Sequence, residues 1–255
     1  MSSLGVEIKE SPISEAEFAA MQEFVSDYLA ASVNNETEGG RMRWYPWHSA
    51  EYRYNHILNV VALATKIARR EGADVDVTRV AAVFHDVAKL SAEQDAHAAV
   101  GADIARQFLT SRAEYPPSFV EAVCGAIEDH SYSGDLDELS LEARCLVEAD
   151  LLDKIGAHGT VLLFLRMGYE SRSHLDSGEV TERVLERGKD VKARVASDTA
   201  DGIAHQRLER VQWFREWLGA EIAGLDDPRD ADDDADSAGN SKDADDAGSR
   251  ATGTR

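Results

Sequence analysis

The feature that most constrains this chain is a core-like segment that carries two adjacent ionisable side chains. Residues 80–88 read Val-Ala-Ala-Val-Phe-His-Asp-Val-Ala, so His85 and Asp86 interrupt a run that is otherwise apolar. Burying a carboxylate in such a run costs several kcal/mol unless another group pairs with it. A divalent cation would pair with both side chains at once. His56 upstream and Asp150 downstream also lie on apolar segments, which gives four candidate metal ligands.

The order of these four residues resembles that of the HD-domain superfamily of metal-dependent phosphohydrolases, and it looks most like the small stand-alone bacterial and archaeal members. The flanking residues are similar over three short segments: Tyr54-Asn-His56, His85-Asp-Val-Ala-Lys89 and Glu148-Ala-Asp150-Leu-Leu-Asp153-Lys-Ile-Gly156. The resemblance covers residues 45–155 well and residues 156–218 more loosely. It implies an all-α fold, an HD-domain helical bundle, with a bound metal ion.

The chemistry of the four candidate ligands limits which metal they suit. Imidazole and carboxylate groups without a thiolate favour a borderline-to-hard divalent ion. We therefore predict that His56, His85, Asp86 and Asp150 bind one such ion, with Mn²⁺ preferred and Mg²⁺, Fe²⁺, Co²⁺ or Ni²⁺ as alternatives. A hydrogen-bonded core position is the alternative for any one of them taken singly.

Two further histidines, His97 and His130, lie on apolar faces of expected helices. In binuclear members of the superfamily, histidines in similar segments hold a second metal. The Gly-Tyr-Pro sequence of the members that cleave cyclic dinucleotides is absent, because residues 131–134 read Ser-Tyr-Ser-Gly. We therefore expect a mononuclear site, in which His97 and His130 contact substrate phosphate or orient the ligands. A core position is an equal alternative for His97.

Three more side chains complete the predicted site. Lys89, one turn after Asp86, is expected to contact phosphate, and Arg53 could bind phosphate through two parallel hydrogen bonds. Asp153, one turn after Asp150, would orient a ligand or the attacking water. Either Asp86 or Asp153 could help to deprotonate that water. The alternatives are a solvated lysine at position 89 and a purely packing role for Asp153.

We therefore expect hydrolysis of a phosphate ester or anhydride, with a nucleotide as the preferred substrate, by a metal-activated water. A metal-bearing nucleotide sensor without turnover is one alternative. Oxygen-dependent di-iron chemistry is another, and it would require a second metal. The chain has no Gly-x-x-x-x-Gly-Lys phosphate loop, no Gly-x-Ser-x-Gly elbow and no dinucleotide fingerprint.

Charge and composition restrict the partners. The formal net charge is −21, of which residues 226–255 carry −6 and residues 1–225 carry −15. This acidity disfavours duplex nucleic acid and predicts adaptation to a high-salt cytosol. No apolar run reaches membrane-spanning length and no signal peptide is evident, so we expect a cytoplasmic protein. Cys124 and Cys145 are expected to be reduced core residues. The sequence leaves the oligomeric state open.

The helical periodicity predicts one HD-type domain over residues 14–225, preceded by a flexible segment 1–13 and followed by a disordered acidic tail, 226–255. The aromatic-rich segment 42–54 could either stack a nucleobase or cover the N-terminal helix. Helices are expected over residues 14–32, 56–72, 77–90, 95–109, 119–130, 140–155, 157–167, 179–195 and 199–222.

Overall fold

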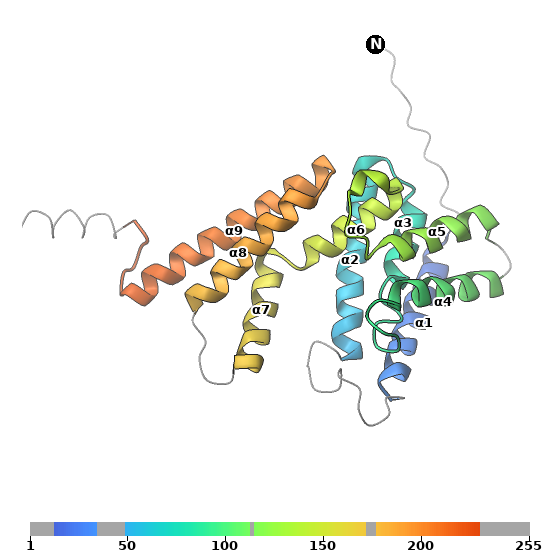
Figure 1. The fold of residues 1–255 in the computed structure, drawn as a ribbon, viewed down its shortest axis with the longest axis horizontal. Coiled ribbons are helices and arrows are strands. Elements are labelled where there is room, and N and C mark those ends of the chain that lie inside the picture. Colours follow the sequence, from blue (N-terminus) through green and yellow to red (C-terminus); the bar gives the residue numbers. More distant parts are fainter. Residues whose placement is uncertain (1–12, 35–48, 113–114, 172–176, 230–255) are drawn as a thin grey trace, which may run out of the picture.

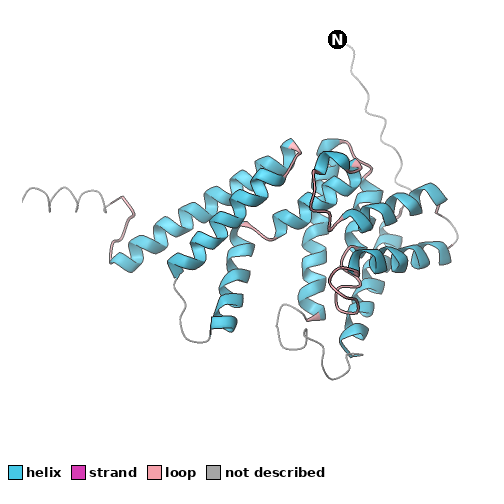
Figure 2. Cartoon of the chain, in the orientation of Figure 1, coloured by secondary structure: helices cyan, strands magenta, loops and turns pink. Residues whose placement is uncertain are grey.

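The structure is a computed structural model that describes residues 13–34, 49–112, 115–171 and 177–229. These residues form helices joined by turns and loops, and none of them lies in a strand (Figure 2). The expected all-α class is therefore confirmed. The predictions for residues 1–12, for 42–48 of the aromatic segment and for the tail beyond residue 229 concern residues outside the described ranges.

The helices form two groups (Figure 1). In the first group, α1, α2, α4, α5 and α6 pack around the buried helix α3. The second group consists of α7, α8 and α9 and lies beside α6. Within it, α8 and α9 run antiparallel. In chain order the helices are α1 (Glu15–Asn34), α2 (Ala50–Glu71), α3 (Val75–Phe84), α4 (His97–Ser111), α5 (Pro117–Asp129), α6 (Leu141–Asp153), α7 (Gly156–Ser171), α8 (Ser177–Arg194) and α9 (Asp198–Ala223).

Capping residues fix several of these helix ends as the sequence predicts. The Ser14 backbone N–H and hydroxyl donate to the Glu17 carboxylate, at 2.8 and 2.6 Å, which forms the expected capping box at α1. Ser140 Oγ accepts a hydrogen bond from the Ala143 N–H at the start of α6. Gly72 ends α2 in the left-handed conformation, with φ 80°.

The core of the first group is built around α3, because apolar residues surround this helix on every side. Val80, Ala81, Val83 and Phe84 are fully buried. The apolar faces of α2, α5 and α6 pack against α3, and the free thiols of Cys124 and Cys145 are buried in the same core. The candidate metal ligands therefore project from closely packed elements.

Two of the expected helix boundaries were wrong, and both errors concern the site. Helix α2 begins at Ala50 rather than at His56, because the Ser49 side chain caps it at Tyr52. Helix α3 ends at Phe84 rather than near Leu90. Beyond Phe84 the chain forms tighter i to i+3 turns, in which the Lys89 N–H donates to the Asp86 carbonyl. His85 and Asp86 thus lie just past a helix end. The other expected boundaries agree to within about four residues.

Candidate metal centre

The structure brings His56, His85 and Asp86 close enough to hold one ion, and it places Asp150, the fourth predicted ligand, beside His56. His56 lies on α2, His85 and Asp86 follow α3, and Asp150 lies on α6. The Nε2 atoms of His56 and His85 each lie 3.7 Å from Asp86 Oδ2, and His56 Nε2 lies 3.2 Å from Asp150 Oδ1. Below, these four residues are called the metal set. His56, His85 and Asp86 are almost completely buried, and Asp150 is largely so.

The hydrogen bonds of His85 leave one of its ring nitrogens available for a metal. Its Nδ1 lies 2.8 Å from the Ala82 carbonyl. This is one of the last carbonyls of α3, which receive no hydrogen bond from an N–H group of the helix. The proton must therefore be on Nδ1, so that Nε2 carries a lone pair. This buried Nε2 has no hydrogen-bond partner among the described residues. Asp150 Oδ1, in contrast, has His56 Nε2 beside it, at 3.2 Å. A buried acceptor without a donor is costly, and a cation bound to His85 Nε2 would satisfy it.

The protonation of the metal set agrees with this arrangement. Burial lowers the pKa of His85 to about 3, so the ring is a neutral ligand. Burial would also lower the pKa of His56, but the carboxylates of Asp150 and Asp153 raise it to about 9. Burial would raise the pKa of Asp150, whereas Lys154 and His56 hold it well below its ordinary value. A proton on His56 therefore occupies, in the absence of metal, the position that a cation would take.

Asp153 lies behind His56 rather than on the wall of the cavity described below. Its Oδ2 accepts from His56 Nδ1 at 2.7 Å, and the residue is 3% exposed. A carboxylate in this position fixes the tautomer and the orientation of a ligating histidine. Of the two roles predicted for Asp153, this geometry corresponds to orienting a ligand.

The second carboxylate oxygen of Asp86 faces another pair of histidines. Asp86 Oδ1 lies 3.6 Å from His97 Nε2 and 3.7 Å from His130 Nε2, and these two nitrogens are 3.1 Å apart. Each Nδ1 lies 2.6 Å from a backbone carbonyl, that of Gln94 or Ile127. His97, His130 and Asp86 could thus hold a second ion. We call His97 and His130 the histidine pair.

The histidine pair already has a cation beside it. Lys89 Nζ donates to His97 Nε2 at 2.9 Å and lies 3.8 Å from Asp86 Oδ1. Burial lowers the pKa of Lys89, and the carboxylate of Asp86 opposes that effect. The ammonium group thus lies where a second metal ion would bind, which is consistent with the mononuclear site predicted from the sequence.

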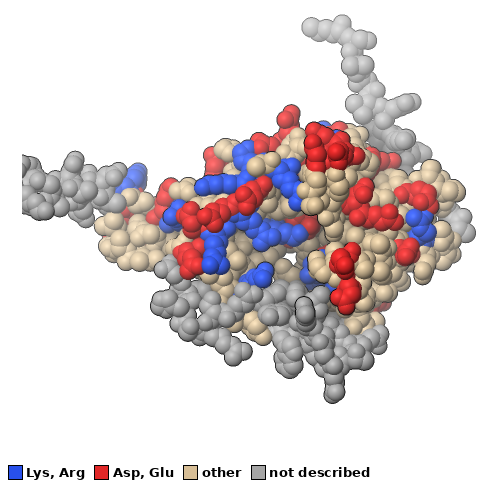
Figure 3. Space-filling view, in the orientation of Figure 1, with Lys and Arg blue, Asp and Glu red and all other residues tan. Residues whose placement is uncertain are grey.

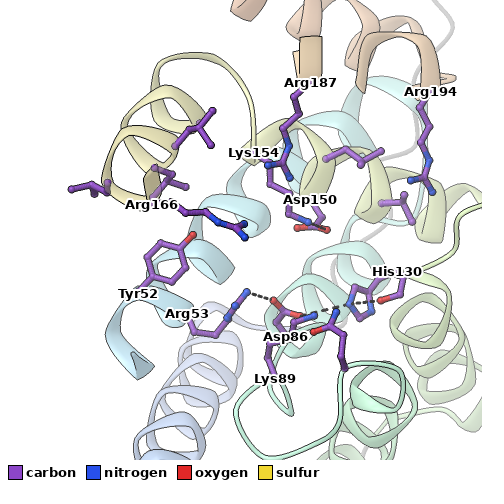
Figure 4. Close-up of a pocket in the computed structure, with 18 of the residues that line it drawn as sticks. Tyr52, Arg53, Asp86, Lys89, His130, Asp150, Lys154, Arg166, Arg187 and Arg194 are labelled. Atoms are coloured by element: carbon purple, nitrogen blue, oxygen red, sulfur yellow. Dashed lines mark hydrogen bonds and ion pairs between the residues drawn. The ribbon is translucent and has the colours of Figure 1, made fainter. Parts of the chain in front are cut away.

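A cavity of about 830 Å³ opens over the metal set, between the two groups of helices (Figure 4). Arg53, Lys89 and His130 line it, as their predicted contacts with substrate require. Arg53 Nη1 also donates to Asp86 Oδ2 at 2.7 Å. His97 is not on the cavity wall and contacts Lys89 instead, so the geometry does not support the predicted substrate contact of His97.

The sequence analysis missed the opposite wall of this cavity. Arg166 on α7 and Arg187 and Arg194 on α8 extend toward the space above Asp86 and Asp150, as does Lys154 at the end of α6 (Figure 4). The available signal was weak: Arg187 and Arg194 are seven residues apart, on one face of a helix, in a chain with only 27 Lys and Arg. Nothing in the sequence shows that this face covers the metal set.

The sequence is similar to those of known proteins over part of its length. Residues 53–155 match the family model described as HD domain, and this range contains the whole metal set. Three curated relatives match parts of the chain. A tRNA (cytidine(56)-2'-O)-methyltransferase from Thermoplasma volcanium is 35% identical over 63 residues. A Ribonuclease Y from Chloroflexus aurantiacus is 28% identical over 162 residues. A symmetrical bis(5'-nucleosyl)-tetraphosphatase from Halalkalibacterium halodurans is 30% identical over 96 residues.

These relatives are matched only in part. The alignments cover 25%, 61% and 38% of this chain, and 19%, 30% and 50% of the respective relatives. The chain thus spans half or less of the length of the curated relatives it matches.

Solved structures share the fold over most of the chain. Bacillus subtilis YpgQ in complex with ADP is 20% identical, with a TM-score of 0.56 over 82% of this chain and 98% of that one. An HD-superfamily hydrolase from Bacillus thuringiensis is 20% identical, with a TM-score of 0.57 over 81% and 98%. Separately, none of the helices in the described ranges is long and apolar enough to span a membrane.

Proposed function

We propose that this chain, whose residues 53–155 match the HD-domain family model, hydrolyses a phosphate ester or anhydride of a nucleotide. The observation that carries the proposal is the buried His85 Nε2, which has no hydrogen-bond partner among the described residues and lies beside Asp86, beneath a cavity whose walls are rich in Lys and Arg. Mn²⁺ is the favoured ion, and His56, His85, Asp86 and Asp150 are its proposed ligands.

The residues around the metal set have different proposed roles in substrate binding and in the reaction. A divalent ion in the metal set would lower the pKa of a bound water and neutralise charge on the phosphate. Lys89 and Arg53, both on the cavity wall, would neutralise the remaining phosphate oxygens, and His130 would hydrogen-bond to one of them. Asp153 positions His56 without contacting the substrate.

The reaction consumes one water. A bond forms between the water oxygen and phosphorus, and the bond from phosphorus to the leaving oxygen breaks. One water proton would pass to a carboxylate, for which Asp86 on the cavity wall is the candidate, and from there to the leaving oxygen or to bulk water. Asp86 is preferred to Asp153 for this step because Asp153 lies behind His56.

The names of two relatives support this substrate class. One is a bis(5'-nucleosyl)-tetraphosphatase and one solved structure was obtained in complex with ADP, so proteins of similar sequence or fold act on or bind nucleotides. The metal-bearing sensor and the di-iron oxygenase remain the alternatives. The single domain over residues 14–225, the cytoplasmic location and the high-salt adaptation stay predictions.

The test is turnover by the purified chain with Mn²⁺, on a panel of phosphomonoesters, phosphodiesters and nucleoside mono-, di- and triphosphates. Release of phosphate or pyrophosphate that is lost in Asp86→Asn would support hydrolysis. Nucleotide binding without turnover, by protein shown to contain its metal, would instead support the sensor.

A further inference from the structure

The cavity is a basic region in an acidic chain. Six of the twenty residues that line it are Lys or Arg and two are Asp, whereas the whole chain has 27 Lys and Arg against 48 Asp and Glu. Figure 3 shows blue basic side chains gathered along α8 and around the hollow between the two groups of helices, with acidic side chains on the surrounding surface. A positively charged cavity attracts anions. Its volume of about 830 Å³ is large enough for a ligand the size of a nucleotide.

The cations on the metal side of the cavity are already paired. Arg53 and Lys89 lie 2.7 and 3.8 Å from the Asp86 carboxylate, and Lys154 donates to Asp150. These three exceed the charge of the two carboxylates by one. That surplus and a metal ion would together neutralise one phosphate group of a ligand, the one that Arg53 and Lys89 contact.

The arginines of α8 are not paired in this way. Neither Arg187 nor Arg194 forms an ion pair with a carboxylate of the described residues. Arg194 donates to the Tyr132 carbonyl, and its Nε is buried without a partner. Both side chains point into the cavity, and Arg166 of α7 points into it from the side (Figure 4).

The junction that carries Arg194 is held firmly against the metal-binding helix. Glu148, two residues before Asp150, is fully buried. Its carboxylate accepts from the N–H groups of Ala196 and Ser197 at 2.8 and 2.7 Å, and from the Ser197 hydroxyl at 2.6 Å. Charge-assisted bonds of this kind fix the end of α8 relative to Asp150, so the two walls keep a defined separation.

We propose that Arg187 and Arg194, with Arg166 beside them, form a second anion subsite that binds a further phosphate of the substrate. The proposal rests on the proposed function, in which the metal set binds the phosphate that reacts. The substrate class is then a compound with at least two linked phosphates, such as a nucleoside di- or triphosphate, rather than a monophosphate. Leu162, Leu165 and Tyr169 of α7 provide an apolar wall for its organic part.

A linked-phosphate small molecule fits these observations better than an RNA strand. An RNA-binding protein requires basic residues that extend along the surface on both sides of the site. Here six of the 27 Lys and Arg residues line the cavity, and the rest of the surface belongs to a chain of formal net charge −21. We therefore treat RNA as an outcome that the experiment must be able to detect.

The experiment compares Arg187→Gln and Arg194→Gln with the wild-type protein, with Mn²⁺ and with AMP, ADP and ATP as probes that differ only in the number of phosphates. Arg183→Gln is the matched control, because Arg183 is an exposed arginine of the same helix, pairs with Glu179 and does not line the cavity. Both kcat/KM and the dissociation constants of the probes for metal-free protein are measured. The second readout does not depend on turnover.

We expect wild type to prefer ADP and ATP to AMP. Each cavity variant should lower kcat/KM and weaken binding by about 10–100-fold for ADP and ATP, the usual effect of losing one charge-assisted contact, and by less than about threefold for AMP. Arg183→Gln should behave as wild type with all three probes.

Three outcomes would overturn the subsite: equal losses for AMP and ATP, no loss in either cavity variant, or Arg187-dependent cleavage of a short single-stranded RNA with no turnover of ADP or ATP. Absence of turnover of every probe, combined with Arg187-dependent binding that is tighter for ADP than for AMP, would support the subsite and reject the hydrolase function. The two proposals can thus fail separately.

Discussion

Asp86 faces two clusters of buried histidines, and the two differ in one respect. On one side lies the metal set, where His85 Nε2 has no hydrogen-bond partner among the described residues, although Arg53 and Lys154 contact its carboxylates. On the other lies the histidine pair, where the Lys89 ammonium group donates to His97 Nε2 at 2.9 Å. Both clusters use the same kinds of ligand and both are buried. The comparison shows that ligand type and burial do not by themselves distinguish a metal site from a hydrogen-bonded cluster; what differs is whether a protein cation already contacts the imidazole nitrogen that would bind the ion.

From this difference we expect one metal where the residues could hold two. An ammonium group beside two imidazole nitrogens and a carboxylate supplies the positive charge that a second ion would bring. A metal ion entering the histidine pair would have to displace Lys89 or bind close to it, and like charges at such distances in a buried site repel strongly. We therefore infer that Lys89 keeps the site mononuclear.

The largest expected effect on metal content and kcat comes from substituting a residue of the metal set. His85→Ala or Asp86→Asn should remove the bound metal and lower kcat by at least about 10³-fold, because these residues act as a unit with the ion. His205→Ala, at an exposed position on α9, is the control and should change neither quantity. Metal content and hydrolysis are measured on the same preparations. Full metal content in Asp86→Asn would mean that the ion is bound elsewhere.

The next effect concerns the lysine that distinguishes the two clusters. Lys89→Met should keep the first metal, gain a second one at the histidine pair, and lower kcat/KM by about 10²–10³-fold through loss of a phosphate contact. Lys66→Met, an exposed lysine on α2, controls for the loss of charge. Elemental analysis and kinetics check both parts. A variant that still holds one metal would show that Lys89 does not exclude the second, and unchanged kinetics would make Lys89 an ordinary solvated lysine.

The comparison also shows what the sequence can predict about this site. His56, His85, Asp86 and Asp150 could be found because ionisable residues on apolar segments are costly without a common partner. The state of His97 could not, since it depends on a contact with Lys89 that forms only once residues 85–96 turn back.

Most of the fold could be predicted from local features of the sequence. The opposite wall of the cavity could not. Capping residues such as Ser14 and Ser140 act locally, so most helix ends followed from the sequence. The end of α3 did not, because the segment after Phe84 is as apolar as the helix itself. The placement of Arg187 and Arg194 over the metal set depends on how α8 packs, which periodicity does not determine.

The smallest effect is expected from the residue that orients His56. Asp153→Asn keeps an acceptor for His56 Nδ1 but removes the negative charge, so metal affinity should fall by about 10–100-fold while the fold is retained. Titration with Mn²⁺ measures the affinity, and excess Mn²⁺ should restore most of the activity. If activity stays low when the site is saturated with metal, Asp153 takes part in the reaction itself.

The number of divalent ions in the wild-type chain tests the central claim most directly. The protein is purified without added chelator, loaded with excess Mn²⁺, freed of unbound ion and measured by elemental analysis against protein concentration. One ion per chain is the predicted result, because His56, His85, Asp86 and Asp150 are its proposed ligands while Lys89 already contacts His97 and Asp86. Two ions per chain would contradict the account and would make His97 and His130 metal ligands.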